Sequence, residues 1–486
     1  MQYSEYFRKF NANDEEDVVQ YIPNEKAEEF LLKNAPRLYC PNSTIEETFA
    51  FRTWTMRKHI KNTDVGFVLT EFLPDVPWAA KYNTINAPLT HHLNEFRWLK
   101  NADDFLDYIN FFINGDGSEN GAFTYHTPAL TAMYEYCIVT ANEEFLRNNA
   151  EAFERYFQEW EIRHGTPNGL YWSQDNYEGT EFSIGGTTSD KVILKGFRPL
   201  FNSCMYGDAL SLSKIYAMAG NVEKSEFYAK KAEVIKRAIN EILWDGTFFK
   251  AIHPYHQDFN KEITHKDIPE ECNARELMGY IPWAYNAADE ERESVFALLK
   301  DPTVFKGKTG FTTADMSNKR FLFYTQPSCS WNGHVWPYAT SYVINACIKL
   351  LKDYQQAVIN DTDLYEFVKQ YAEMHYIIED GKKRNFIDES MEPFEFRWYT
   401  RERLKEENVY NRGKDYNHST FIDLVLRGLC GITAETDTLT VNPRIKGIWK
   451  WFKIENLSYR KQSYTVYYDE DGCVFNKGKG VIIEKA

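Results

Sequence analysis

The sequence has no long hydrophobic run. None of its 486 residues falls in a stretch of about 18 apolar residues, so no segment is predicted to cross a membrane. The opening residues, MQYSEYFRKFNANDEEDVV, contain no apolar core of the secretory type, and we expect no signal peptide. Clusters of lysine and arginine are also missing, and the formal net charge is −15. Nucleic acids and anionic membranes are therefore poor candidates for a partner, and a neutral ligand is expected.

Closely spaced cysteines are absent as well. The eight cysteines are scattered and form no C-x-x-C pair, so we expect reduced thiols in a cytoplasmic protein. The adjacent His91 and His92 do not belong to an H-E-x-x-H motif, and no P-loop, G-x-G-x-x-G or G-x-S-x-G motif occurs. The sequence therefore predicts neither a metal nor a cofactor.

Aromatic residues, in contrast, are abundant. They make up 16% of the chain, with 12 Trp, 32 Tyr and 34 Phe. Aromatic rings suit the flat apolar faces of sugars, although a large helical core would use them equally well. Composition alone does not choose between these two uses.

Helical periodicity dominates the middle of the chain. Apolar residues recur at helical spacing from about residue 45 to 430, and Gly220-Asn221 marks one helix end. Residues 1–44 are charged and irregular, which suggests an N-terminal cap. Residues 433–486 contain TLTVNP, YTVYY and GCVF, whose alternation predicts a few β-strands. We therefore divide the chain into 1–44, a helical domain at 45–432, and a β-tail at 433–486.

The loops between the helices carry the unusual residues. They read WSQDNYEGTEFSIGG, PSCSWNGHVWPYAT, IDESMEPFEFRWYT and NRGKDYNHSTF. Such loops on a helical scaffold often carry function. Hydrolysis of a glycoside with inversion needs two carboxyl groups, roughly 6.5–9.5 Å apart, on opposite faces of the sugar. Acids that stand beside aromatic rings in these loops are therefore the candidates for such a pair.

Two loops contain acids beside aromatic rings. The first combines Trp172 with Asp175, Glu178 and Glu181. An acid beside apolar rings has a raised pKa, as a general acid at neutral pH requires. The competing interpretation is a solvated acidic loop. The second loop alternates acids and apolar residues around Glu389, and the competing interpretation there is an exposed edge.

Two further loops suit the walls of a sugar site. One contains Trp331, Gly333, His334 and Trp336 just before a helix, where it could equally form a helix start with a core tryptophan. The other is dense in hydrogen-bonding groups that could hold hydroxyls or cap the next helix. Its candidate ligand-binding residues are Arg412, Asp415 and His418.

Together these motifs resemble those of the six-hairpin (α/α) barrel glycosidases. The nearest members are mannosylglycerate hydrolases and the processing α-glucosidases of glycoside hydrolase family sixty-three. These enzymes carry G-x-D-N-S, in which Asp is the general acid, and residues 179–183 read GTEFS. The resemblance makes Glu181 the acid. Because Glu replaces Asp and Phe replaces Asn, Asp175 and Glu178 stay as alternatives.

Two further motifs match in the same order. The family's W-x-G-P-V-W-P corresponds to WNGHVWP at 331–337, with His334 in place of Pro. Its E-x-Y-x-P, in which Glu is the base, corresponds to Glu389 and Pro393. The early pocket-lining loops of the family correspond here to residues 71–75, Asn83 and residues 91–98. The resemblance would place Asn83, His92 and Arg97 at the substrate.

The resemblance implies an all-α fold, an (α/α)6 toroid of helical hairpins with a small C-terminal β-segment. It also implies an inverting, exo-acting α-glycosidase that cleaves a short oligosaccharide or glycoside. Trp172, Trp331 and Trp336 would shape the sugar site. Two alternatives stay open: an epimerase or lyase that uses His334, His418 or Tyr416, and a non-catalytic carbohydrate-binding protein.

Overall fold

The computed structural model describes residues 2–115, 119–253, 259, 261 and 268–486. Six helices close into an inner ring in which each packs on the next and α15 returns to α4. In order they are α4 (Leu89–Phe96), α6 (Leu130–Val139), α9 (Pro199–Met218), α11 (Ile281–Ala284), α12 (Pro337–Asp353) and α15 (Phe421–Leu424). Helices α9 and α12 are buried around most of their circumference, as expected for the interior of a large helical protein.

An outer layer of helices covers this ring. It contains α3 (Ser43–Lys58), α5 (Leu106–Asn114), α8 (Ala150–His164), α10 (Val222–Ala238) and α13 (Asp361–Glu373). Helices α8 and α10 pack on α9, α13 packs on α12, and α3 packs on α15. Helix α10 packs on α9 through one apolar face. Its buried side chains, which recur at helical spacing, are Tyr228, Ala232, Ile235 and Ala238. The short helices α7 (Glu143–Asn148) and α14 (Tyr399–Glu406) lie in the connections.

The predicted helices of the middle segment are present. The helix end predicted at Gly220-Asn221 is confirmed, because α9 ends at Met218 and Gly220 has a positive φ of 75°. The first segment is more regular than predicted. It forms α1 (Gln2–Ala12) and α2 (Asn24–Asn34), and the apolar face of α1 is anchored by Tyr3, Phe7 and Phe10.

The C-terminal strands form a sheet that also takes a strand from the N-terminal segment. Its order is β1-β10-β11-β12, all antiparallel. The strands are β1 (Arg37–Tyr39), β10 (Trp451–Tyr459), β11 (Gln462–Asp469) and β12 (Gly480–Lys485). The GCVF segment is not a strand as predicted, because Asp469 accepts hydrogen bonds from the backbone of Gly472, Val474 and Phe475 and holds it as a turn. The three-part division of the chain stays a prediction. In the structure, β1 from the first part pairs with β10 from the last part.

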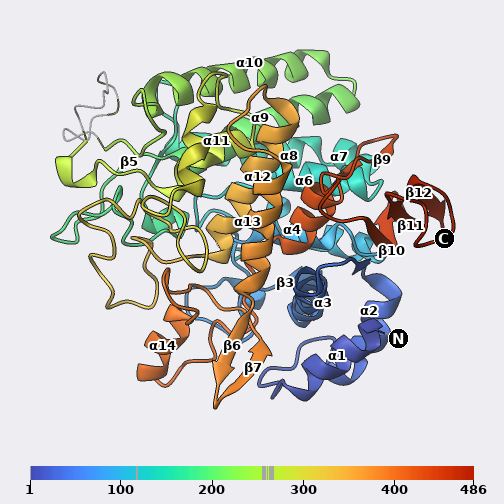
Figure 1. Ribbon diagram of the computed structural model, residues 1–486. Helices are drawn as coiled ribbons and strands as arrows, with labels where there is room; N and C mark the ends of the chain where they lie inside the picture. The colour runs from blue at the N-terminus through green and yellow to red at the C-terminus, as the bar shows by residue number, and fades with distance from the viewer. Residues whose placement is uncertain (1, 116–118, 254–258, 260, 262–267) are drawn as a thin grey trace.

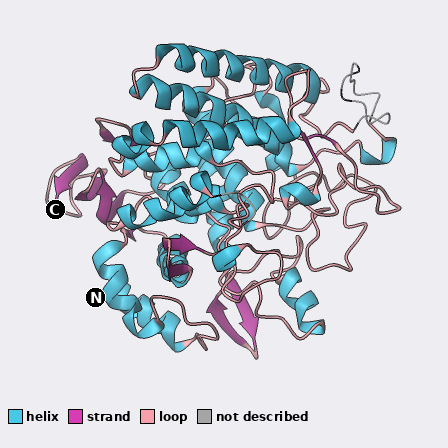
Figure 2. Ribbon diagram, turned by 180° about the vertical axis from the view of Figure 1, so that it is seen from behind, coloured by secondary structure: helices cyan, strands magenta, loops and turns pink. Residues whose placement is uncertain are grey.

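Two-stranded hairpins complete the secondary structure. They pair β2 (Ile60–Thr63) with β3 (Gly66–Leu69), β4 (Trp172–Ser173) with β5 (Gly196–Phe197), β6 (Tyr376–Glu379) with β7 (Lys382–Asn385), and β8 (Ile432–Ala434) with β9 (Leu439–Val441). Long loops gather on the side of the molecule opposite the C-terminal sheet, and both chain ends lie on the side of that sheet (Figures 1 and 2). No helix among the described residues is both long and apolar enough to cross a membrane.

Candidate active site

A cavity of about 340 Å³ brings the separate loops together. Two of its carboxyl groups are Glu181 and Glu389, which are 208 positions apart in the chain but line the same space. Its walls are largely aromatic. The lining rings belong to Phe72, Trp78, Tyr125, Trp331, Trp336, Tyr338 and Tyr416. Such a concave site, in which charged and hydrogen-bonding groups lie among aromatic rings, is typical of a small-molecule site.

Glu181 is held by a tightly bonded loop. It follows the 3-10 turn Asn176–Glu178, and its backbone carbonyl accepts a hydrogen bond from the backbone N–H of Trp331 at 3.0 Å. The next residue, Phe182, has a φ of 60°, a left-handed conformation that is unfavourable for a bulky side chain. The Cys329 thiol donates a hydrogen bond to Glu181 Oε2 at 3.0 Å. Burial raises the pKa of Glu181 to about 7, although this hydrogen bond opposes the rise.

Glu389 has a different environment. Its Oε1 accepts hydrogen bonds from Nη2 and Nε of Arg412, at 2.7 and 3.2 Å. Burial raises the pKa of Glu389, and the Arg412 guanidinium opposes that rise by favouring the carboxylate. Its backbone N–H donates to Asp388 Oδ1 at 2.7 Å, which fixes the segment. Paired backbone hydrogen bonds of 2.9 Å between Val335 and Met391 join this loop to the tryptophan loop.

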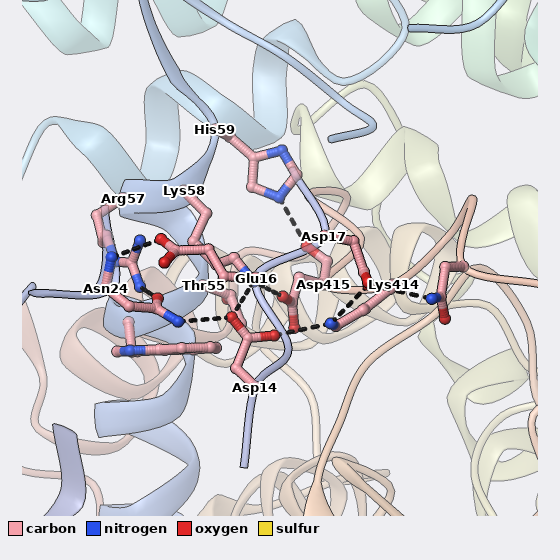
Figure 3. A network of polar contacts seen from close by, with 12 residues as sticks. Asp14, Glu16, Asp17, Asn24, Thr55, Arg57, Lys58, His59, Lys414 and Asp415 are labelled. Atoms are coloured by element: carbon pink, nitrogen blue, oxygen red, sulfur yellow. Dashed lines mark hydrogen bonds and ion pairs between the residues drawn. The ribbon is translucent and has the colours of Figure 1, made fainter. Parts of the chain in front are cut away.

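The loop that carries Arg412, Tyr416 and His418 is anchored from outside the ring. In Figure 3 the Asp415 carboxylate points to Lys58 at the end of α3, and Asp14 bridges Lys58 and Lys414. The distances from Asp14 are 2.9 Å to Lys58 Nζ and 2.8 Å to Lys414 Nζ. The N-terminal segment therefore helps to hold the cavity wall, a role that its sequence did not reveal.

The structure places several predicted ligand-binding residues at the cavity and others elsewhere. Trp331, Trp336, Arg412 and His418 line it. Gly333 and His334 do not appear in its lining within the described chain, and the buried His334 ring stacks on Tyr399 with 3.7 Å between centroids. Asp415, whose φ of 61° is left-handed, pairs with Lys58 and does not line this cavity in the described structure.

Three other predicted residues have partners outside the cavity lining. Trp172 is paired in β4, and its ring contacts His164 and the ammonium of Lys195. Asn83 bonds the backbone of residues 72, 74 and 76, and so stabilises its own loop. His92 is fully enclosed and bonds Tyr108. None of these side chains lines the cavity in the described structure.

Arg97 and the two alternative acids also have structural partners. Arg97 donates to Asp423 at 2.5 Å and Glu135 at 2.9 Å and lines a different cavity. Asp175 is fully buried and accepts a hydrogen bond from the Thr187 hydroxyl at 2.5 Å. Glu178 reaches the cavity lining, but its carboxylate is paired with Arg198 at 2.8 Å. Burial raises the pKa of Glu178, and the Arg198 guanidinium opposes that rise, so this carboxyl group already has a charged partner in the protein.

Glu71 is a further carboxyl group at the cavity. It lies shortly after β3 and lines the same cavity as Glu181 and Glu389. The family resemblance indicated that residues 71–75 form a pocket-lining loop, but it gave Glu71 itself no role. Among the described residues, no group of three or more His, Cys, Asp or Glu side chains is arranged to hold a metal ion.

A ring of paired helices with two glutamates in an aromatic cavity defines the class of glycoside hydrolases with a six-hairpin barrel. Comparison with known proteins places the chain within that class. Residues 81–419 match the model of the mannosylglycerate hydrolase MGH1-like glycoside hydrolase domain. The chain belongs to this family. No curated protein matches it by sequence.

Solved structures agree on the fold. A protein titled sialidase superposes with a TM-score of 0.88 and 30% identity, over 100% of this chain and 43% of its own. The chain thus spans less than half the length of that protein. The family 63 mannosylglycerate hydrolase of Thermus thermophilus, in complex with glucose, gives a TM-score of 0.54 at 11% identity, over 78% of this chain and 99% of its own. A bacterial glucoamylase complexed with acarbose gives 0.53 at 10%, over 83% and 58%. The predicted (α/α)6 barrel is confirmed.

Proposed function

We propose that the chain is an inverting, exo-acting glycosidase, with Glu181 as the general acid and Glu389 as the general base. The observation that carries the proposal is that these two glutamates, from separate loops, line one aromatic cavity. Inversion needs a proton donor on one side of the sugar and a base that activates water on the other. A short α-linked glycoside is the proposed substrate, in line with the family.

The environments of the carboxyl groups support these roles. Burial brings the pKa of Glu181 to about 7, so a large fraction carries a proton near neutral pH. Glu389 is bonded to Arg412, which favours the ionised form that a base requires. Burial raises the pKa of Glu71 to about 8, so that this third carboxyl is mostly protonated at neutral pH and is a weak base.

An epimerase or lyase mechanism has less support. His334 lies outside the cavity lining, and burial lowers the pKa of His418 to about 3. Burial and the nearby Glu71 hold the pKa of Tyr416 well above its usual range. Neither ring therefore exchanges protons readily near neutral pH. A non-catalytic binding protein would have no need of two differently tuned acids across one cavity.

A terminal acidic sugar is a second candidate substrate. The specific observation is the 30% identity, over the whole of this chain, to a protein titled sialidase. Arg412, which lines the cavity, would be the cation for a sugar carboxylate. Its pairing with Glu389 leaves the cavity close to electrically neutral, which favours a neutral sugar.

The test is a panel of α-linked neutral disaccharides and sialosides, with the anomer of the first product followed by NMR. We expect turnover with inverted configuration. Glu181→Gln and Glu389→Gln should each lower kcat by orders of magnitude and leave the fold intact. Asp208→Asn is a matched control, because Asp208 is a buried acid on α9 that bonds the start of α6 and does not line this cavity. Near wild-type turnover in both glutamine variants would contradict the proposal.

A further inference from the structure

Glu71 is a third carboxyl group in the cavity, and the proposed mechanism does not use it. Its side chain is only 7% exposed, yet it lines the space shared by Glu181 and Glu389. It also precedes the stretch at 81–419 by which the family is recognised. A buried acid at a binding cavity is costly unless its oxygen atoms have partners.

One oxygen of Glu71 is fully engaged. Oε1 accepts a hydrogen bond from the Tyr416 hydroxyl at 3.1 Å and lies 2.8 Å from Nδ1 of His418. Tyr416 and His418 are also in direct hydrogen-bond contact with each other. These three groups form a closed triangle. Whether Glu71 or His418 carries the proton between them, Oε1 is occupied by protein partners.

The other oxygen is in the opposite situation. Oε2 has no hydrogen bond within the described chain, and it is not among the polar atoms sealed in the interior without a partner. Since Glu71 lines the cavity, Oε2 is left facing it. Burial keeps the pKa of this carboxyl high and the group mostly uncharged at neutral pH, so a ligand can meet it without bringing a positive charge.

We propose that Glu71 Oε2 binds one hydroxyl of the terminal sugar and thereby makes the cavity specific for a sugar with a free hydroxyl at that ring position. This inference rests on the proposed function, because it takes the cavity as the sugar site. Tyr416 and His418 act as positioning residues that fix the carboxyl plane. Sugars that are deoxygenated or methylated at that position leave Oε2 without a partner and are rejected.

The test compares monosaccharides with their monodeoxy analogues by calorimetry. Glucose, mannose and N-acetylneuraminic acid are bound to a Glu181→Gln protein, so that hydrolysis plays no part. One deoxy position should weaken binding at least about 10-fold, the size expected when a buried polar group loses its partner. When Glu71→Leu is added to this protein, removal of the same hydroxyl should have almost no effect on affinity. Removal of any other hydroxyl should change the affinity as it does when Glu71 is present. The Asp208→Asn version should retain the wild-type pattern.

A second measurement covers the case in which Glu71→Leu does not fold. In the Glu181→Gln background, the infrared band of a protonated carboxyl should shift when the sugar binds, and this shift should vanish in Glu71→Gln. The proposal is overturned if each deoxy sugar loses the same factor in affinity with and without Glu71, or if the infrared band does not shift on sugar binding. If the protein nevertheless hydrolyses glycosides, only the role of Glu71 is refuted. Absence of both binding and hydrolysis refutes the sugar cavity as a whole.

Discussion

Replacement of Arg412 by methionine should narrow the pH range of activity from its acidic side. Arg412 gives two hydrogen bonds to Glu389 Oε1, and its side chain is 17% exposed. Hydrogen bonds to a charged group contribute about 1.5–3 kcal/mol. Loss of that amount from the ionised form raises the pKa of Glu389 by roughly one to two. Because the base must be deprotonated, the acidic limb of the kcat/KM profile moves to higher pH.

The assay is the pH dependence of kcat/KM on the substrate identified by the panel. At the midpoint of the wild-type acidic limb, where the wild type keeps about half of its maximum kcat/KM, we expect the variant to keep roughly a tenth or less of its own maximum. The alkaline limb, which reports the acid, should stay in place. Arg412→Lys keeps the charge but loses the planar fork, and it should give a smaller shift. If the acidic limb of Arg412→Met stays in place or moves to lower pH, Glu389 is not the base or Arg412 does not control it.

The other predictions concern the second glutamate and the N-terminal anchor. Cys329→Ala removes the hydrogen bond that lowers the pKa of Glu181, so the alkaline limb should move to higher pH, whereas exposed Cys473→Ala should leave the profile unchanged. Lys58→Met leaves Asp14 with one fewer cation in a buried network, and thermal unfolding should show a loss of about 3–5 kcal/mol. Nearby lysines hold the pKa of Asp14 below its usual value. Its contribution to stability is therefore present above about pH 4 and should be lost as the pH falls through the folded-state pKa, which a series of melting curves would measure.

Much of the scaffold was predictable because its signals are local. Helical spacing of apolar residues located α9, α10, α12 and α13, and the glycine after α9 marked its end. The two acidic loops could be selected because acids beside aromatic rings are unusual. Their meeting in one cavity was expected from the resemblance and is seen in the structure.

The orientation of single side chains could not be predicted in this way. Trp172 belongs to an aromatic and acidic loop, but pairing of β4 with β5 directs its ring to His164. Arg97 follows α4, and its direction is decided by Asp423, 326 positions away. The orientation of Glu71, in a loop that the resemblance places at the pocket, likewise depends on Tyr416, which is 345 positions distant. Contacts across such distances depend on closure of the whole ring, which no local pattern encodes.

The pairing of β1 with β10 ties the N-terminal segment to the C-terminal sheet. Arg37 and Glu455, which bond across these strands, are 418 positions apart. At synthesis rates of roughly 5–20 residues per second, β1 waits on the order of 20–80 s for its partner. During that time the edge of β1 that will pair with β10 has no partner strand. An unpaired strand edge can pair with another chain, so β1 is a site of possible aggregation until β10 is made.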